Sequence, residues 1–201
     1  MSSQYSNAPI LHNPAARRGA SRPELVFFLA CVLLVLSVVI PSWVAVVQRR
    51  HLALARSDIR LLVNAGEKFM REYGVWPTAR TSDRGDVRFG RELPNREVIH
   101  ALKAVDADGN EDHAVNPQRI DFLTAPAYTA EGSGLNDAGE YLDPWGSPYQ
   151  IVFDTDFNDV CDVQNSIYGR LIGEGIIIWS CGPDRKSDTL DDILSWKMPK
   201  K

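Results

Sequence analysis

The sequence predicts an α+β fold in which one long N-terminal helix packs on a small antiparallel sheet. Residues 25–47 are apolar and uncharged, and the residues that follow keep the spacing of an amphipathic helix. The C-terminal third instead carries short apolar runs separated by turn residues, which is the pattern of short strands. A helical part followed by a part rich in strands is typical of the α+β class.

The apolar run is long enough to cross a membrane. A spanning helix needs roughly 20 apolar residues, and residues 25–47 meet that length without a charge. About 150 residues remain beyond the run and its leader, which suits one soluble domain. Charge bias does not decide the orientation, because arginines flank the run on both sides. They are Arg17, Arg18 and Arg22 before the run, and Arg49, Arg50, Arg56 and Arg60 after it.

The helix is expected to continue beyond the apolar run. Apolar residues recur at helical spacing at Leu52, Ile59, Leu62, Val63, Phe69 and Tyr73. We therefore expect one continuous helix over residues 24–73, kinked at Pro41 and weakened at Gly66. Gly74 supplies the stop, and Pro77 prevents the helix from restarting.

The middle of the chain is polar and rich in turns. Within residues 78–140 we expect a short helix over residues 96–105. Residues 106–110 read DADGN and resemble half of a calcium-binding loop. Pro117 stands at the twelfth position, where such a loop needs a bidentate glutamate, so a solvated turn is expected there.

The C-terminal third alternates apolar runs with acidic turns. Residues 149–153 and 175–180 have the composition of strands, and residues 193–196 close the chain with another apolar segment. Between them, residues 154–162 and 184–192 are expected to form acidic turns. Asp154, Asp156, Asn158 and Asp159 offer a second possible ion site in the first of these turns, although a plain turn is the favoured interpretation there.

Composition excludes some functions and leaves others open. The net charge is −4, and no basic face for nucleic acid is visible. From residue 137 onward the chain holds 12 acidic and 6 basic residues, which suits cations better than phosphates. The four histidines accompany neither a nucleophile motif nor a zinc pattern. Cys161 and Cys181 could form a disulfide in an exported domain, or remain thiols.

The N-terminus has the features of a processing site. Residues 1–19 contain no acid and end in two arginines and Gly19. Cleavage after Gly19 would leave Ala20 with a free amine, four residues before Glu24 at the edge of the apolar run. A carboxylate at this depth is costly unless it is wetted by headgroups or meets a cation. In a bundle of such helices, the amine of one chain could pair with Glu24 of its neighbour.

This arrangement resembles the type IV prepilin and pseudopilin signal. That family has a basic leader ending in glycine, a cleavage site, a glutamate at the fifth mature position and a long apolar helix. Gly19, Ala20, Glu24 and residues 25–47 match these features. The residues between Ala20 and Glu24 depart from the family, because they read SRP where apolar residues are usual.

Three C-terminal segments resemble the major pseudopilin of type II secretion systems. Residues 141–149 read YLDPWGSPY, residues 180–184 read SCGPD and residues 189–196 read TLDDILSW. Their order and spacing are similar to those of that family, whereas any one segment alone is weak. With the N-terminal signal, the resemblance covers residues 19–77 and 141–197.

The resemblance implies one calcium ion in the loop between the last two segments. By matched position, the expected ligands are Asp184, Asp191, Asp192 or Asp188, and the backbone carbonyl of Cys181. Calcium prefers several oxygen ligands on a flexible loop, which is consistent with this set. A solvated acidic turn is the alternative.

The resemblance also implies a pilin-like fold and a structural role without catalysis. It divides the chain into a prepilin leader (1–19), a transmembrane helix (20–50) and a periplasmic domain (51–201). Such a subunit lies in the inner membrane and self-associates into a helical fibre. Its other partners would be further pseudopilins, an inner-membrane assembly platform and the prepilin peptidase. The alternatives are a type IV pilus or competence pilin, and a membrane-tethered periplasmic enzyme or binding module.

Overall fold

The computed structural model describes residues 22–81, 86–130, 132–163 and 166–199. The chain divides into two compact units, one ending at Ala45 and the other running from Val46 to Lys201. The expected leader lies outside the described residues, and so do Gly19 and Ala20 of the expected cleavage site.

A single long helix, α1, extends from Arg22 to Tyr73 and confirms the predicted continuous helix. It runs through Pro41, so this proline does not end it. Gly74 follows in the left-handed region, at a φ of +72°, and its N–H donates to the Met70 carbonyl at 2.8 Å. This glycine ends the helix as expected, because such a backbone conformation costs a glycine little.

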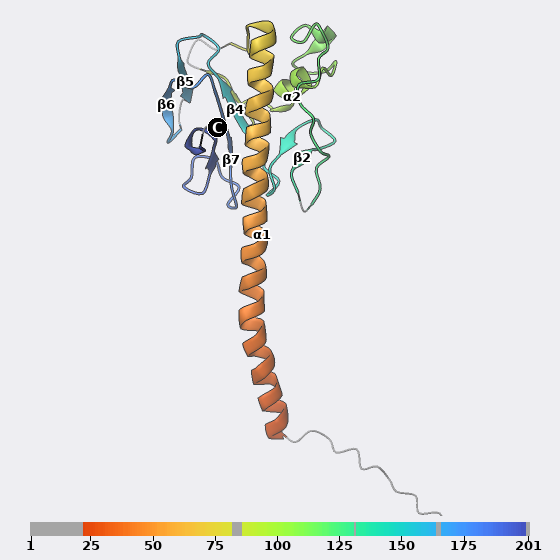
Figure 1. Ribbon diagram of the computed structural model, residues 1–201, viewed down its shortest axis with the longest axis vertical. Coiled ribbons are helices and arrows are strands. Elements are labelled where there is room, and N and C mark those ends of the chain that lie inside the picture. Colours follow the sequence, from red (N-terminus) through yellow and green to blue (C-terminus); the bar gives the residue numbers. More distant parts are fainter. Residues whose placement is uncertain (1–21, 82–85, 131, 164–165, 200–201) are drawn as a thin grey trace, which may run out of the picture. The chain divides into compact units, whose positions relative to one another are not determined.

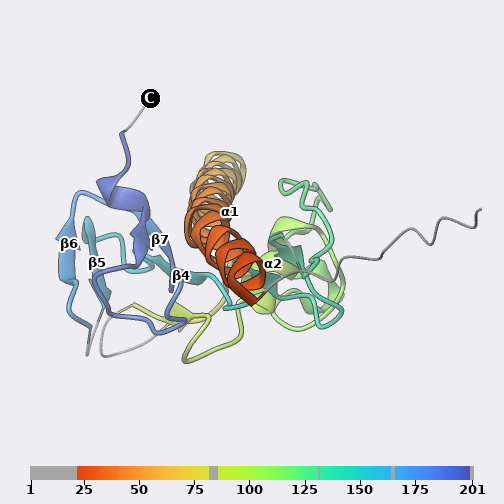
Figure 2. The ribbon, with the colours of Figure 1, turned by 90° about the horizontal axis from the view of Figure 1, so that it is seen from below.

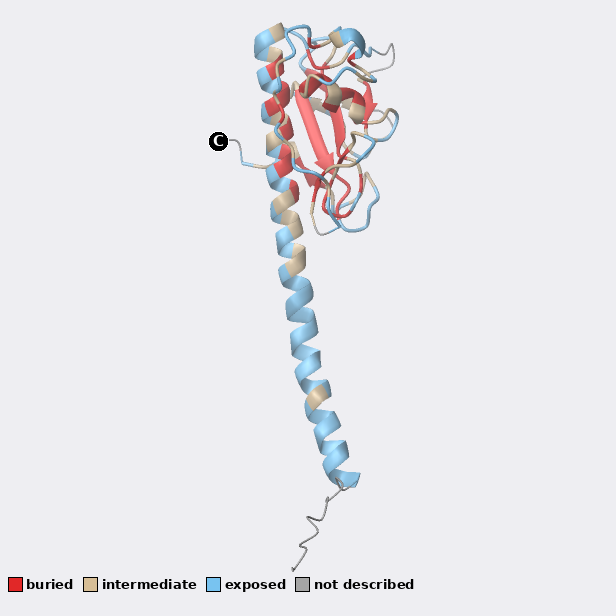
Figure 3. Ribbon diagram, turned by 90° about the vertical axis from the view of Figure 1, so that its right-hand side faces the viewer, coloured by how far each residue is buried: buried red, intermediate tan, exposed pale blue. Residues whose placement is uncertain are grey.

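The first part of α1 is apolar and exposed, as the pale blue colour in Figure 3 illustrates. It is the one helix among the described residues that is long and apolar enough to cross a membrane. The large side chains Phe27, Leu34 and Trp43 are each about 70 % exposed. Water is a poor solvent for such a surface, so the prediction of a single-pass anchor agrees with the structure.

The second part of α1 buries one face. Its buried residues are Ala55, Asp58, Ile59, Leu62, Ala65, Gly66 and Phe69. Gly66 has a packing role, because a Cβ there would lie 2.7 Å from the Ile176 side chain. The glycine that lowers helix propensity therefore lets α1 approach the sheet closely.

A four-stranded antiparallel sheet packs on that face. Its strands are β1 (Arg88–Phe89), β4 (Gln150–Phe153), β7 (Ile176–Ser180) and β8 (Ile193–Leu194), in the order β1-β4-β7-β8. Residues 149–153 and 175–180 were predicted as strands, and β4 and β7 confirm this. In β4 and β7, Ile151 pairs with Ile178 and Phe153 with Ile176.

Both faces of this sheet are buried. Ile151, Phe153, Ile176 and Ile178 belong to the larger core with α1. Their neighbours in the strands belong to a smaller core that also takes in Cys161 and Val163 of β5. The sheet residues of this smaller core are Val152, Ile177, Trp179 and Leu194. Burial on both faces explains why β7 reads IIIWS, an apolar run without polar alternation.

The remaining elements flank α1 on two sides. The ribbon of β5 (Val160–Val163) and β6 (Gly169–Ile172) lies on the side of the sheet, and α2 (Arg96–Leu102) lies on the other side (Figures 1 and 2). The second ribbon, β2 (Gly134–Leu135) and β3 (Tyr141–Leu142), lies on the side of α2. Two short 3-10 helices, η1 (Glu111–His113) and η2 (Ser195–Lys197), complete the fold.

Three of the sequence-based boundaries change. The predicted helix over residues 96–105 ends at Leu102. Residues 160–162, expected in an acidic turn, belong to β5 because Val160 and Cys161 pack into the smaller core and pair with β6. The expected closing segment 193–196 is divided between β8 and η2.

A buried carboxylate joins α1 to the C-terminal half of the domain. Asp58 accepts hydrogen bonds from the hydroxyl groups of Tyr141, at 3.2 Å, and Tyr149, at 2.9 Å. All three residues are buried, and burial raises the pKa of Asp58. Because Tyr141 and Tyr149 bracket the segment 141–149, this contact fixes that segment against the helix.

Candidate functional site

The candidate site is the loop of residues 181–192, which connects β7 to β8. Its two ends are held together because Ser180 pairs with Ile193 across the strands. Gly182 begins the loop at a φ of +66°, and a Cβ there would lie 2.5 Å from the Asp191 carbonyl oxygen. Only glycine fits this approach without strain. The glycine thus allows the two ends of the acidic loop to meet.

Asp184 and Asp191 come together at that meeting point. The Asp184 N–H donates to Asp191 Oδ2 at 3.2 Å, and the Thr189 hydroxyl donates to Asp191 Oδ1 at 2.7 Å. The bond from Thr189 lowers the pKa of Asp191, so this carboxyl is held in its charged form. Both aspartates are exposed, and both carry oxygen atoms at the surface of the loop.

Asp192 is less exposed than Asp191. Its Oδ2 accepts hydrogen bonds from the Tyr168 hydroxyl at 2.6 Å and from the Asp188 N–H at 2.9 Å. Burial raises the pKa of Asp192, in the opposite direction to that of Asp191. Tyr168 belongs to the turn before β6, so Asp192 ties the loop to the neighbouring ribbon.

Asp188 faces arginines. Its Oδ2 lies 3.2 Å from Nη1 of Arg88 and 2.9 Å from Nη1 of Arg91, and its Oδ1 accepts a short hydrogen bond from Ser166. Two guanidinium groups supply the positive charge that this carboxylate needs. Of the loop aspartates, Asp188 is therefore the one already matched with cations of the protein itself.

Arg88 of β1 belongs to the site, but the sequence analysis did not predict its part in it. Its side chain is only 4 % exposed, and its guanidinium carbon lies 4.7 Å from the centre of the Trp179 ring. It donates to Gln150 at 3.1 Å and also makes a short hydrogen bond to Ser187. A buried guanidinium needs such partners for its several donors. No local sequence pattern around Arg88 indicates them.

The segment 141–149 lies against the start of the loop. Asp143 is fully buried and accepts hydrogen bonds from the N–H groups of Trp145 and Ser147, at 3.0 and 2.8 Å. The Ser180 hydroxyl donates to Asp143 Oδ2 at 2.6 Å, and burial raises the pKa of Asp143. The three segments noted in the sequence therefore meet. The segment 180–184 contacts the segment 141–149 through Ser180, and it contacts the segment 189–196 through Asp184.

The two cysteines of the domain are buried thiols without a disulfide. Cys161 lies in β5, where its thiol donates to the Glu174 carbonyl at 3.0 Å. Cys181 directly follows β7, and burial raises its pKa to about 12. A thiol of this kind is unreactive at neutral pH. Only the backbone carbonyl of Cys181 was expected to take part in the site.

A second acidic loop, residues 154–159, follows β4 and lies near Asp86. Among the described residues, Asp86, Asp154 and Asp156 are the one group of three acids whose ligand oxygens all lie within 4.8 Å of one another. Asp154 is buried, and its pKa is raised by burial and by the neighbouring carboxylates of Asp156 and Asp86. This group could hold a metal ion.

Backbone N–H groups support the second loop. Asp154 accepts from Asn158 and Asp159, and Asp86 accepts from Thr155 and Asp162 at 3.1 and 2.9 Å. None of the three clustered acids pairs with a described lysine, arginine or histidine. The sequence drew attention to this loop, but Asp86 lies too far away in the chain for any local motif to include it.

Oxygen atoms are the ligands that calcium prefers, and both loops supply them. In the loop 181–192 the fit rests on the exposed carboxylates of Asp184 and Asp191 and on nearby backbone carbonyls. Asp192 is engaged by Tyr168, and Asp188 is engaged by Arg88 and Arg91. The resemblance-based set therefore divides into two exposed carboxylates, which accept hydrogen bonds only from within the loop, and two half-buried ones with partners outside it.

Glu24, the expected assembly residue, lies in the first turn of α1 and is exposed. A carboxylate in the first turn of a helix is favoured by the helix dipole. Its expected partner, the amine of Ala20, lies outside the described residues.

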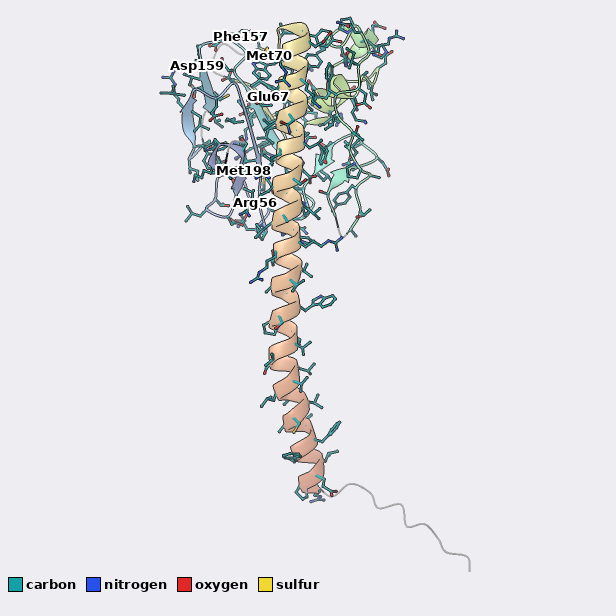
Figure 4. All side chains as sticks on the ribbon, in the orientation of Figure 1. Arg56, Glu67, Met70, Phe157, Asp159 and Met198 are labelled. Atoms are coloured by element: carbon teal, nitrogen blue, oxygen red, sulfur yellow. The ribbon has the colours of Figure 1, made fainter. Side chains whose placement is uncertain are left out.

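A cavity of about 540 Å³ lies between α1 and the C-terminal segment. Its described lining includes Arg60, Glu67, Glu174, Trp76 and Met198, and no histidine or cysteine. Figure 4 labels Glu67 on α1 and Met198 near the end of the chain. Ser195 also lines the cavity, and its hydroxyl accepts a hydrogen bond from the Ile178 N–H at 3.0 Å.

Comparison of this chain with protein-family models, with curated proteins and with solved structures found no match in any of the three.

Proposed function

We propose that this chain is a pseudopilin, a structural subunit of the fibre that a type II secretion system uses to move proteins across the outer membrane. The observation that carries the proposal is the meeting of the three resemblance-bearing segments at one end of the sheet. Asp143 of the first accepts from Ser180 of the second at 2.6 Å, and Asp184 of the second donates to Asp191 of the third at 3.2 Å. Because the three segments contact one another in the fold, their joint occurrence in the sequence has a structural explanation.

The anchor supports assembly into a fibre. The exposed apolar part of α1 continues into the half of the helix that carries the domain. In such a fibre the apolar parts of several copies would pack together, and the small side chains of Ala30, Ser37 and Ala45 would allow close approach. Glu24 would meet the N-terminal amine of a neighbouring copy after cleavage at Gly19.

The pilin-like interpretation also supplies the orientation and the partners. The domain would lie in the periplasm, anchored in the inner membrane. The chain would contact other pseudopilins, the assembly platform and the prepilin peptidase. A type IV pilus or competence pilin would share these features, but the aspartate-rich loop between β7 and β8 favours the secretion branch.

Calcium is part of the proposal. One ion would be held by the carboxylates of Asp184 and Asp191 and by the carbonyl of Cys181, with Asp192 behind them. Bound calcium would screen the repulsion between these carboxylates and thereby order the loop. Asp188 would contribute through its arginine partners rather than as a ligand.

Self-crosslinking in membranes tests the fibre proposal. The full chain, expressed with a complete secretion system, should give a ladder of homo-oligomers with a membrane-permeant crosslinker. Glu24→Ala should insert normally, because it removes a charge at the membrane edge, yet should lose the ladder. Glu67→Ala, on the exposed side of the same helix, is the matched control and should keep the ladder. Wild-type protein that stays monomeric would contradict the proposal and favour a tethered enzyme or binding module.

Processing provides an independent measurement. Mass spectrometry of the membrane-extracted chain should find a mature N-terminus at Ala20. An intact leader in cells with active prepilin peptidase would count against the proposal.

A further inference from the structure

Four arginines cluster where α1 leaves the apolar run. Arg49 and Arg50 follow residue 47 almost at once, and Arg56 and Arg60 follow further along. All four side chains are exposed. Arg49, Arg56 and Arg60 are spaced by seven and four residues, so they lie within about 40° of one another around the helix axis. We call these four residues the basic collar.

The basic collar has no acidic partner within the described residues. None of its arginines lies within 4.0 Å of a described carboxylate, whereas Arg80, Arg88, Arg91, Arg96 and Arg170 each form an ion pair. The sole acid between residues 46 and 60 is Asp58, which is buried and bonded to Tyr141 and Tyr149. The positive charge of the collar is therefore not neutralised within this part of the chain.

The first two arginines of the collar are expected at the height of the lipid headgroups. A helix rises about 1.5 Å per residue, so Arg49 and Arg50 stand roughly 3–5 Å beyond the last apolar residue. The headgroup layer on each side of a bilayer is about 5–7 Å thick, which includes this position. Arg56 and Arg60 stand roughly 14 and 20 Å beyond it, at the outer reach of the surface potential.

The collar lies on exposed positions of α1, and only Arg60 also lines the cavity between α1 and the C-terminal segment. The domain packs on the buried residues Ala55, Asp58, Ile59 and Leu62, whereas Arg49, Arg56 and Arg60 are exposed. Figure 4 labels Arg56 on α1. The acidic loop 181–192 belongs to β7 and β8, whose side chains Ile176, Ile178 and Ile193 pack into the core shared with α1. No ion pair joins the collar to a described aspartate of the acidic loop, because Asp188 pairs with Arg88 and Arg91 instead.

We propose that the basic collar binds the phosphate groups of anionic membrane lipids, with Arg49 and Arg50 in direct contact. A guanidinium presents paired donors that match the oxygens of a phosphodiester, and it binds them more specifically than a point charge does. Arg56 and Arg60 strengthen the attraction through the surface potential. The proposal does not depend on the pseudopilin assignment, because anionic lipid is available to any chain anchored by this helix.

Native mass spectrometry of the full chain in neutral detergent tests the proposal. With equal amounts of phosphatidylglycerol and phosphatidylcholine added, the wild-type chain should retain phosphatidylglycerol preferentially. Each arginine near the surface should contribute roughly fivefold at low salt. Arg49→Gln/Arg50→Gln should therefore remove most of the preference, Arg56→Gln should weaken it less, and Arg60→Gln least.

The matched control is Lys68→Gln/Arg71→Gln, which removes the same charge from exposed positions further along α1. These residues lie more than 30 Å beyond the apolar run by helix rise, well outside the screening distance of about 8–10 Å. The control should retain the wild-type preference. Equal losses in both double variants would overturn the proposal and indicate a general effect of net charge.

Two further outcomes would overturn the proposal. One is equal retention of both lipids by the wild-type chain. The other is displacement of the retained phosphatidylglycerol by inorganic phosphate at a matched phosphate concentration, because that would indicate a free-phosphate site. Unchanged melting temperatures of the variants would verify that these exposed substitutions leave the fold intact.

Discussion

The loop 181–192 and the loop 154–159 are both rich in aspartate, but their negative charge is handled differently. In the first, Asp188 pairs with Arg88 and Arg91, and the other aspartates accept hydrogen bonds from within the loop and from Tyr168. In the second, Asp154 and Asp156 are joined by a third acid, Asp86, and no described cation pairs with them. The loop with more aspartates, four against three, is thus the one whose negative charge is better matched by described cations.

The difference shows that the number of aspartates in a loop does not determine where unmatched carboxylates gather. Tertiary contacts determine this, because the first loop receives two arginines from the region of β1 whereas the second receives another aspartate from just before β1. The charge state of each loop therefore depends on a short stretch, residues 86–91, far from both in sequence.

The largest expected effect comes from removing the buried arginine. Arg88→Ala should leave Asp188 without its buried partner and should also remove the contact with Trp179. Breaking one partner of a buried pair typically costs about 3–5 kcal/mol. Thermal melting of the full chain should therefore fall by roughly 10 °C, at about 2–4 °C per kcal/mol.

Arg91→Ala is the control for that prediction. Arg91 contacts the same carboxylate, but its side chain is 58 % exposed. An exposed ion pair contributes only about 0–1 kcal/mol. If Arg88→Ala destabilised the chain no more than Arg91→Ala, Asp188 would not depend on its buried partner.

Calcium should produce the next largest effect. An ion that binds only the folded loop stabilises the fold by about 2.7 kcal/mol when its free concentration is one hundred times Kd. Melting in calcium should therefore exceed melting in EDTA by several degrees, and magnesium should do less because it gives up water reluctantly. Asp184→Ala and Asp191→Ala should each remove most of this shift.

Asp154→Asn decides between the two loops. It should keep the calcium shift if the ion lies in the loop 181–192. Loss of the shift in Asp154→Asn, with retention in Asp191→Ala, would move the ion to the group of Asp86, Asp154 and Asp156. Identical melting in calcium and EDTA would reject both positions.

Asp191 of the first loop and Asp154 of the second should respond to pH with opposite signs. The lowered pKa of Asp191 contributes stability above the unfolded value of about 3.9, and this is lost as pH falls through the folded pKa. The raised pKa of Asp154 means that the folded chain binds its proton more tightly, so stability falls as pH rises from the unfolded to the folded pKa.

Melting in EDTA between about pH 3 and 6 measures this difference. Relative to wild type, Asp154→Asn should gain stability as pH rises, whereas Asp191→Asn should lose stability. Parallel profiles for the two variants would contradict the contrast between Asp191 and Asp154.

The smallest effect is expected at Leu190, which is fully exposed in the loop 181–192. Leu190→Ser should change the free energy of unfolding by no more than about 0.5 kcal/mol, because a surface side chain without contacts contributes little. Chemical denaturation of the detergent-solubilised chain measures it. If Leu190→Ser lowered the free energy of unfolding by more than about 1 kcal/mol only at high protein concentration, Leu190 would contact another copy of the chain.

Much of the fold could be predicted from sequence because its strongest patterns are local. Apolar spacing and Gly74 delimit α1, and the apolar run of β7 is visible in the sequence. Strand β1 could not be predicted, since it has two residues and exists only through its pairing with β4. From its helix propensity, Gly66 was expected only to weaken the helix. Its close approach to Ile176 is a tertiary contact that propensity does not describe.

The candidate site was predicted less completely. The aspartates of the loop 181–192 were named from their sequence, yet their partners Arg88 and Tyr168 are separated from them by strands that only folding brings together. Asp86 was missed for the same reason. The fate of Cys161 and Cys181 also required the structure, because cysteine count cannot establish which thiols meet.

The hydrogen bonds from Tyr141 and Tyr149 to Asp58 give the domain a mechanical property. Two hydroxyl groups on one carboxylate add a directional restraint to the apolar packing, because hydrogen bonds weaken steeply with distance and angle. An axial slip of α1 by one residue, about 1.5 Å, would disrupt both bonds. A force applied along the second half of α1 would therefore load these two hydrogen bonds in shear and act directly on the segment 141–149.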